Sequence, residues 1–330
     1  MMMMMIAKDK TDPNNSIQTE WKSSSNDDDL LHRTIHTQFP SLSTIVMIHG
    51  WLQNGKIFKE KSAAFRKQFP NHPQFAFSFP DAPFVQSRGE VSQMISSPAR
   101  VINSSDEDNK NNNAEEPIPD EALQRTWVFS RANRTVYARW REAILYLLNF
   151  MRKERKEGKR IDGLLGFSQG GAILTVLAAL ISMEYHHLLN RESLPNSLFE
   201  PQPHDEDETN FDDIIEAIRE LFFRVNPENG KKECTLKFVI LVGTFKPNSI
   251  QINQVVETLF SRNLKIGGFF KALHIYGLND DIIKPERSQE LAEDWYCKEG
   301  TVILTHPKKH ILPTGSEVKE ELRRFVKSSL

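Results

Sequence analysis

Short runs of apolar residues recur along the chain, and several of them end at glycine or proline. They are rich in β-branched and aromatic side chains, a composition typical of strands that are buried in a sheet. The runs cover residues 44–48, 75–79, 161–165, 238–243, 272–277 and 301–305. We therefore expect a sheet built from these segments.

Longer segments between the runs predict helices. The sequence favours helices over about residues 55–68, 133–157 and 172–181, and the last of these is continuously apolar. Apolar residues of the second segment follow the helical period and predict its buried face. They are Tyr137, Trp140, Ile144, Leu147, Leu148 and Met151. Strands that alternate with helices predict an α/β fold with a mostly parallel sheet and helices on both faces.

Polar residues are concentrated in three blocks, which account for the mean hydropathy of −0.48. Residues 1–40, rich in Asn, Ser, Asp and Thr, predict a disordered tail. Residues 41–330 then form one domain, which carries two low-complexity insertions at about residues 88–121 and 192–210. Neither insertion has enough apolar residues to form a core of its own.

Composition narrows the possible partners and the cellular compartment. The net charge of −2 argues against nucleic acid or an anionic membrane as the main partner. With only Cys234 and Cys297, the chain has no disulfide framework or zinc-binding pattern, which favours a cytoplasmic location. No apolar run approaches the roughly 20 residues of a membrane span, so we expect no integral membrane segment. An organellar leader stays open, and the sequence does not indicate an oligomeric state.

The pentapeptide Gly166-Phe167-Ser168-Gln169-Gly170 has the form G-x-S-x-G. It lies between an apolar strand and an apolar helix, where the chain must turn sharply. Glycine on both sides permits this turn without a Cβ clash, so the serine hydroxyl projects above the edge of the sheet. This context predicts that Ser168 is a nucleophile.

A serine nucleophile needs a base and a carboxylate that orients the base. Asp280 and Asp281 follow the strand at 272–277, while His306 and His310 follow the strand at 301–305. The carboxyl ends of parallel strands meet at one sheet edge, so these residues are expected near Ser168. The pattern alone leaves open which aspartate and which histidine act.

The loop after the first strand is the expected site of an oxyanion-binding group. Backbone N–H groups of Trp51 or Leu52, together with that of Gln169, are candidates to stabilise the negative charge. His49, at the start of this loop, is interpreted as a structural residue rather than the base.

The chain resembles the FSH family (family of serine hydrolases) of the α/β-hydrolase superfamily. The resemblance extends over roughly residues 44–325 in the same order. It is carried by H-G-W-L-Q-N-G at 49–55, D-A-P at 81–83, R-T-W at 125–127, I-D-G at 161–163, G-F-S-Q-G-G at 166–171, Y-G-L-N-D at 276–280 and H-P-x-x-H-x-x-P at 306–313.

The resemblance implies an α/β-hydrolase fold and selects Asp280 and His310 as the partners of Ser168. It also implies a serine hydrolase that cleaves small-molecule carboxylic esters or acyl thioesters through an acyl-enzyme, without a metal or cofactor. One departure lies in the histidine loop, where Lys308-Lys309 replaces the one or two glycines usual in the family.

Two questions remain open at this level. Four aromatic residues are candidates either for an acyl pocket or for the core: Trp51, Phe84, Trp127 and Phe129. The alternative functions are a phospholipase- or peptidase-like serine hydrolase, or a non-catalytic binding module on the same fold.

Overall fold

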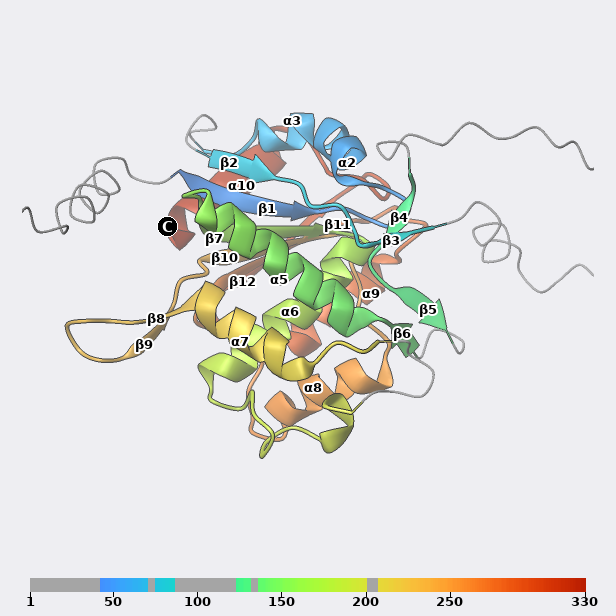
Figure 1. Cartoon of the computed structure of the whole chain (residues 1–330). Helices are drawn as coiled ribbons and strands as arrows, with labels where there is room; N and C mark the ends of the chain where they lie inside the picture. The colour runs from blue at the N-terminus through green and yellow to red at the C-terminus, as the bar shows by residue number, and fades with distance from the viewer. Residues whose placement is uncertain (1–41, 71–74, 87–122, 132–135, 201–206) are drawn as a thin grey trace, which may run out of the picture. The chain divides into compact units, whose positions relative to one another are not determined.

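The computed structural model describes residues 42–70, 75–86, 123–131, 136–200 and 207–330 (Figure 1). The predicted tail at 1–40 and the predicted insertion at 88–121 lie outside the described residues. In the described part of the chain, six strands form the main sheet in the order β12-β11-β10-β7-β1-β2. They are β1 (Ser43–Ile48), β2 (Phe75–Ser78), β7 (Arg160–Phe167), β10 (Phe238–Val242), β11 (Lys271–Gly277) and β12 (Thr301–His306).

Every neighbouring pair of strands in this sheet is parallel. The central strands β7 and β10 are buried almost from end to end, as expected for strands covered on both faces. Each of the six apolar runs identified in the sequence is one of these strands. The predicted α/β fold with a parallel sheet is therefore confirmed.

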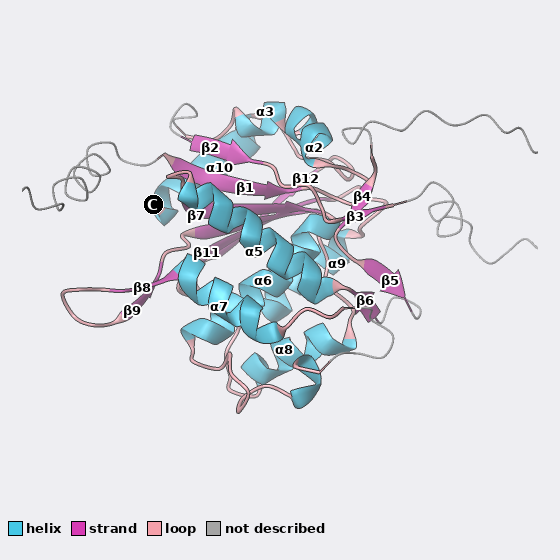
Figure 2. Cartoon of the chain, in the orientation of Figure 1, coloured by secondary structure: helices cyan, strands magenta, loops and turns pink. Residues whose placement is uncertain are grey.

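Helices cover both faces of the sheet (Figure 2). They are α2 (Gly55–Lys61), α3 (Ala63–Arg66), α5 (Trp140–Lys156), α6 (Gln169–Tyr185), α7 (Phe211–Phe222), α8 (Ile250–Phe260), α9 (Pro285–Glu290) and α10 (Ser316–Ser329), with short helical segments at η4 (Asn196–Leu198) and η5 (Leu291–Trp295). Among the described residues, three small antiparallel pairs lie outside the main sheet: β3 (Phe84–Val85) with β4 (Arg125–Thr126), β5 (Phe129–Arg131) with β6 (Val136–Ala138), and β8 (Phe223–Val225) with β9 (Lys232–Cys234). None of the described helices is long and apolar enough to cross a membrane.

The two faces of the sheet belong to two separate hydrophobic clusters. On β1, Val46 and Ile48 pack with residues of α5, α6, α7 and α8. Ile45 and Met47 face the other way and pack with residues of α2, α3 and α10. This alternation follows from the two-residue side-chain period of a strand. The arrangement is the α/β-hydrolase fold that the resemblance implied.

Two helix predictions need correction. The helix expected at 55–68 is divided into α2 and α3 at Ser62, whose hydroxyl donates to the carbonyl of Lys59 and competes with regular helix bonding. The helix expected from residue 133 begins only at Trp140, because Arg139 adopts a left-handed φ of 61°. Tyr137 is therefore a residue of β6, although it is buried as predicted.

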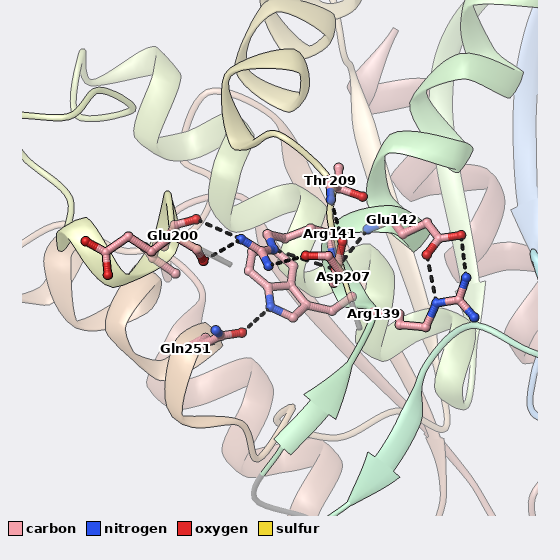
Figure 3. Close-up of polar contacts among 9 residues, drawn as sticks. Arg139, Arg141, Glu142, Glu200, Asp207, Thr209 and Gln251 are labelled. Atoms are coloured by element: carbon pink, nitrogen blue, oxygen red, sulfur yellow. Dashed lines mark hydrogen bonds and ion pairs between the residues drawn. The ribbon is translucent and has the colours of Figure 1, made fainter. Parts of the chain in front are cut away.

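A buried ion pair joins the second polar segment to α5 (Figure 3). The Asp207 carboxylate accepts the backbone N–H of Arg141 at 3.0 Å and that of Glu142 at 3.3 Å. In return, the Arg141 guanidinium donates to the carbonyls of Glu200 at 3.1 Å and Asp207 at 2.9 Å. Both side chains are almost completely inaccessible to solvent. The described residues at this end of the 192–210 segment are therefore packed against the core.

Candidate active site

Ser168 lies at the sharp turn between β7 and α6. Its backbone has φ 53° and ψ −120°, a combination that is strained for a residue with a Cβ. Neither Gly166 nor Gly170 has a positive φ, so the strain of the turn is carried by the serine itself. Strain of this kind persists only where the surroundings hold the residue firmly.

The backbone of Ser168 is held by the last residue of β10 and by the segment that follows it. Its N–H donates to the carbonyl of Val242 at 2.9 Å, and its carbonyl accepts the hydroxyl of Thr244 at 3.1 Å. Thr244 is held in turn, because its own carbonyl accepts the buried hydroxyl of Ser288. The strained turn is thus fixed by neighbours distant in the sequence.

His310 and Asp280 form a direct pair close to the same turn. The Asp280 Oδ2 atom lies 2.7 Å from His310 Nδ1, and both side chains are largely buried. The other carboxylate oxygen, Oδ1, accepts the N–H groups of Ile282 at 3.0 Å and Ile283 at 2.9 Å. With Nδ1 donating to Asp280, the Nε2 atom is the ring nitrogen that remains to accept a proton.

The His310 ring is held on two sides. It packs against the ring of Phe167, the residue before Ser168, with a centroid separation of 4.8 Å. On another side lies Gly243, where an added Cβ would come within 2.9 Å of the His310 Nδ1 and Cε1 atoms. Gly243 also has a φ of 53°. A glycine is therefore required here for two reasons, neither of which its place at the end of an apolar run indicates.

The competing residues lie in other environments. Asp281 is exposed and pairs with Lys309 at 2.8 Å, and this lysine lowers the pKa of its carboxyl group. The His306 Nδ1 atom accepts the backbone N–H of Lys308 at 3.3 Å, and burial lowers the pKa of its imidazole. The structure therefore brings Asp280 to His310, and it places Asp281 and His306 in other contacts.

Lys308 and Lys309 occupy the histidine loop without backbone strain. Neither is among the described residues with a positive φ, so the loop conformation does not demand glycine at these positions. The histidine loop packs closely against Gly277 at the end of β11. An added Cβ at Gly277 would lie 2.2 Å from the Lys308 carbonyl oxygen. The departure from the family pattern is thus compatible with the Asp280–His310 contact.

The candidate oxyanion donors differ in availability. The Leu52 N–H donates to the carbonyl of Arg125 at 3.0 Å, so it is already occupied. Among the described residues, the Trp51 N–H has no acceptor. Gln169 is the first residue of α6, and a helix leaves its first N–H groups without internal partners. Leu52, one of the two alternatives in this loop, is therefore not available as an oxyanion donor. The backbone N–H groups of Trp51 and Gln169 are the candidates that remain.

The side chain of Gln169 has a structural role that the sequence does not indicate. Its Oε1 atom accepts the Thr126 hydroxyl at 3.0 Å and the Trp127 N–H at 2.9 Å. Its Nε2 atom donates to the carbonyl of Val128 at 3.2 Å. The side chain therefore connects the start of α6 to the segment between β4 and β5. A Gln next to the serine gives no signal of such distant contacts in the sequence.

His49 is a structural residue, as its position had suggested. Its ring is fully buried, and burial lowers its pKa to about 4. The Nε2 atom accepts the N–H of Ala82 at 2.9 Å, while Nδ1 lies 2.8 Å from the carbonyl of Gly50. Both ring nitrogens are therefore engaged in the neutral form. In the part of the chain that the structure describes, no three His, Cys, Asp or Glu side chains are arranged to hold a metal ion.

A cavity of about 520 Å³ opens beside Ser168 and His310. Most of its lining is apolar or aromatic. Besides these two residues, the described lining consists of Gly50, Trp51, Gln53, Phe58, Lys61, Phe167, Ile282, Ile311 and Leu312. Of the four aromatic residues considered from the sequence, only Trp51 lines the cavity. The other three, Phe84, Trp127 and Phe129, pack in or against the core cluster on the α5–α8 side of the sheet.

Comparison with known proteins gave several relatives of low sequence identity. The chain is 23% identical to esterase OVCA2 of Danio rerio over 290 residues, which cover 86% of this chain and 96% of that protein. It is 22% identical to a dihydrofolate reductase of Schizosaccharomyces pombe over 285 residues, or 86% of this chain. The chain spans about half the length of that relative (47%). Among solved structures, Zea mays acyl-protein thioesterase 2 matches with a TM-score of 0.48 and 12% identity, covering 88% of this chain and 95% of that one.

A family model described as "Serine hydrolase (FSH1)" matches residues 40–322. The match covers most of the chain, including the turn at Ser168 and the loops that carry Asp280 and His310. The family resemblance seen in the sequence motifs is therefore confirmed, and the chain belongs to the FSH1 serine hydrolase family.

Proposed function

We propose that Ser168, His310 and Asp280 form the catalytic triad of an enzyme that cleaves small-molecule carboxylic esters or acyl thioesters. The single observation that carries the proposal is the 2.7 Å contact between Asp280 Oδ2 and His310 Nδ1. It holds the imidazole in the same cavity as a serine with a strained backbone. Several relatives are named esterases, which supports the same substrate class.

In the proposed reaction the three side chains have separate roles. His310 Nε2 accepts the hydroxyl proton as Ser168 Oγ attacks the acyl carbon. Asp280 stabilises the imidazolium that forms and keeps its ring in the required orientation. The protonated imidazole then gives its proton to the leaving alcohol or thiol, which leaves an acyl group on Ser168. A water molecule, deprotonated by His310, attacks the acyl carbon and releases the carboxylic acid.

Stabilisation of the negatively charged oxygen is assigned to two backbone groups. One is the N–H of Trp51, in the loop after β1, and the other is the N–H of Gln169, the first residue of α6. Each such donor contributes about 3–4 kcal/mol to the transition state. The side-chain bonds of Gln169 to the β4–β5 segment limit its movement, so its N–H needs little reorganisation during the reaction.

The acyl group is assigned to the apolar part of the cavity. Phe58, Phe167 and Leu312 provide a wall beside Ser168 that favours a hydrocarbon chain over a polar one. The acyl chain length and the choice between oxygen and sulfur esters are left to experiment. The cytoplasmic location stays a prediction from the cysteine content.

The test is labelling with a fluorophosphonate probe, which reacts with an activated serine. The wild type should be labelled and should hydrolyse 4-nitrophenyl butyrate, whereas Ser168→Ala and His310→Ala should do neither. Ser261→Ala, which changes an exposed serine after α8, is the matched control and should behave as the wild type. Absence of labelling in a folded wild type would overturn the proposal and favour a non-catalytic binding module. If the wild type is labelled but hydrolyses only phospholipids or peptides, Ser168 is still the nucleophile, and a phospholipase- or peptidase-like function replaces the proposed one.

A further inference from the structure

One charged side chain stands out in the cavity beside Ser168. Of the described residues that line it, Lys61 is the only one whose side chain carries a permanent charge. The rest of the lining is apolar, aromatic or neutral, apart from the His310 imidazole. An apolar pocket with a small number of placed polar groups uses those groups to fix the orientation of a ligand. Lys61 is the candidate for such a group here.

The position of Lys61 follows from the geometry of α2. Phe58 and Lys61 are three residues apart, so they share one face of the helix and are about 5 Å apart along it. The Phe58 ring lies 6.0 Å from that of Phe167, which in turn lies 4.8 Å from the His310 ring. The three rings form a row that begins at His310, and Lys61 lines the same cavity one helical turn after Phe58.

The charge of Lys61 is not neutralised by its own helix. The residues three and four positions away are Ile57, Phe58, Ala64 and Phe65, none of which is acidic. Glu60 is adjacent in sequence and therefore points to a different side of the helix. Among the described residues, Lys61 forms no ion pair with any carboxylate. Lys61 is exposed to solvent and lines the rim of the cavity, and its charge has no carboxylate partner among the described residues.

We propose that Lys61 binds an anionic group carried by the substrate, so that the enzyme prefers acyl esters or thioesters with a carboxylate or phosphate remote from the reacting carbonyl. This inference rests on the proposed function, because it names the substrate class of the same site. The anionic group does not react. Its contact with Lys61 orients the acyl carbon toward Ser168 while the hydrocarbon part lies along the row of rings.

The anion has two possible positions in the substrate, the acyl chain or the leaving group. Three chromogenic esters separate them: neutral 4-nitrophenyl butyrate, 4-nitrophenyl hemiglutarate with a carboxylate on the acyl chain, and 3-carboxy-4-nitrophenyl butyrate with a carboxylate on the leaving group. The measured quantity is the ratio of kcat/KM for each anionic ester to that for the neutral ester. Because both esters are measured on the same variant, this ratio cancels any effect of a substitution that changes the hydrolysis of all esters equally.

The variants are Lys61→Ala, Lys61→Glu and Lys59→Ala. Lys59 is the matched control, because it also lies in the last turn of α2 but does not line the cavity. We expect Lys61→Ala to lower the ratio about 5- to 20-fold for at least one anionic ester, the range for a partly solvated charged contact. Lys61→Glu should lower it further, and 0.5 M salt should weaken the wild-type preference by screening. Lys59→Ala should leave the ratio unchanged.

The outcomes separate this inference from the function on which it rests. A ratio that Lys61→Ala does not change for either anionic ester, while the neutral ester is hydrolysed, overturns only the role of Lys61. Equal losses in Lys61→Ala and Lys59→Ala overturn it as well, because they indicate an effect on the helix or on the general field. A wild type that hydrolyses none of the three esters but reacts with the fluorophosphonate probe overturns the inference alone. A folded wild type that also fails to react with the probe overturns the proposed function as well.

Discussion

The carboxylate of Asp280 contacts the imidazole of His310, whereas the adjacent Asp281 extends into solvent and pairs with Lys309. Two neighbouring acids in one loop thus have different surroundings. The buried one accepts the N–H groups of Ile282 and Ile283, which fix its orientation toward the ring. The exposed one has a partner that is itself largely exposed. This difference gives the first prediction.

Asp280→Asn should lower kcat for 4-nitrophenyl butyrate by about 10³- to 10⁴-fold, because the imidazolium loses its counter-charge and the ring its correct tautomer. Asp281→Asn removes only a surface ion pair and should change kcat less than about threefold. Steady-state kinetics of both variants check this. The reverse ranking would move the acid of the triad by one residue.

Gly243 gives a second prediction, because it lies against the His310 ring. In Gly243→Ala the new Cβ would lie 2.9 Å from His310 Nδ1, so the ring must shift. A shift of about 1 Å in a catalytic group can cost about 10²-fold in rate, and we expect a loss of kcat of that order.

The control for this variant is Gly230→Ala in the turn between β8 and β9. Gly230 has a φ of 68°, but no atom lies within 4 Å of the position of its Cβ. Both variants place alanine in the left-handed region and should lose about 1–2 kcal/mol in free energy of unfolding. Only Gly243→Ala should lose activity. Equal activity in the two would show that the ring tolerates the added methyl group.

The sequence predicted the elements whose signal is local. Each strand of the sheet is a short apolar run, and the turn at Ser168 is marked by its own five residues. The positions of Asp280 and His310 followed from a topological rule, since loops after parallel strands meet at one edge. Choosing between Asp280 and Asp281 required the family resemblance, because both are equally plausible turn residues.

The sequence did not predict features that depend on distant partners. The Leu52 N–H is occupied by a carbonyl of β4, and no local pattern announces that contact. Trp127 was a candidate for the acyl pocket, but its ring is fully buried and its Nε1 donates to the carbonyl of His49 at 2.9 Å. Ile311 and Leu312 follow His310 and line the cavity, so their adjacency to this proposed base was the available signal.

The buried Asp207 gives a third prediction, for stability. Asp207→Ala would leave the Arg141 guanidinium buried without its counter-charge and would remove an acceptor from the start of α5. Loss of one partner of a buried pair costs about 3–5 kcal/mol in free energy of unfolding. Urea unfolding measures this loss. The control Asp212→Ala removes an exposed pair with Arg191 and should cost less than about 1 kcal/mol. Equal losses would show that the Arg141–Asp207 pair has no special role.

The last prediction concerns His274, which lies in β11 and is completely buried. Among the described residues neither of its ring nitrogens has a partner, and its nearest aromatic neighbour is Tyr296, with ring centroids 4.6 Å apart. Burial lowers the pKa of the imidazole from 6.5 to about 3. Below pH 6.5 the unfolded chain therefore binds a proton that the folded chain does not. The free energy of unfolding must then fall as the pH decreases toward 3.

His274→Phe removes this difference in proton binding and breaks no hydrogen bond among the described residues. Between about pH 4.5 and 5.5, its free energy of unfolding should decline less steeply than that of the wild type, by about 1.4 kcal/mol per pH unit. A decline should remain, since buried His49 acts in the same direction with its pKa lowered to about 4. Urea unfolding across this range measures both slopes, with exposed His187→Gln as the control. Parallel curves for wild type and His274→Phe would mean that the folded protein can protonate His274, through an opening or a water molecule beside the ring.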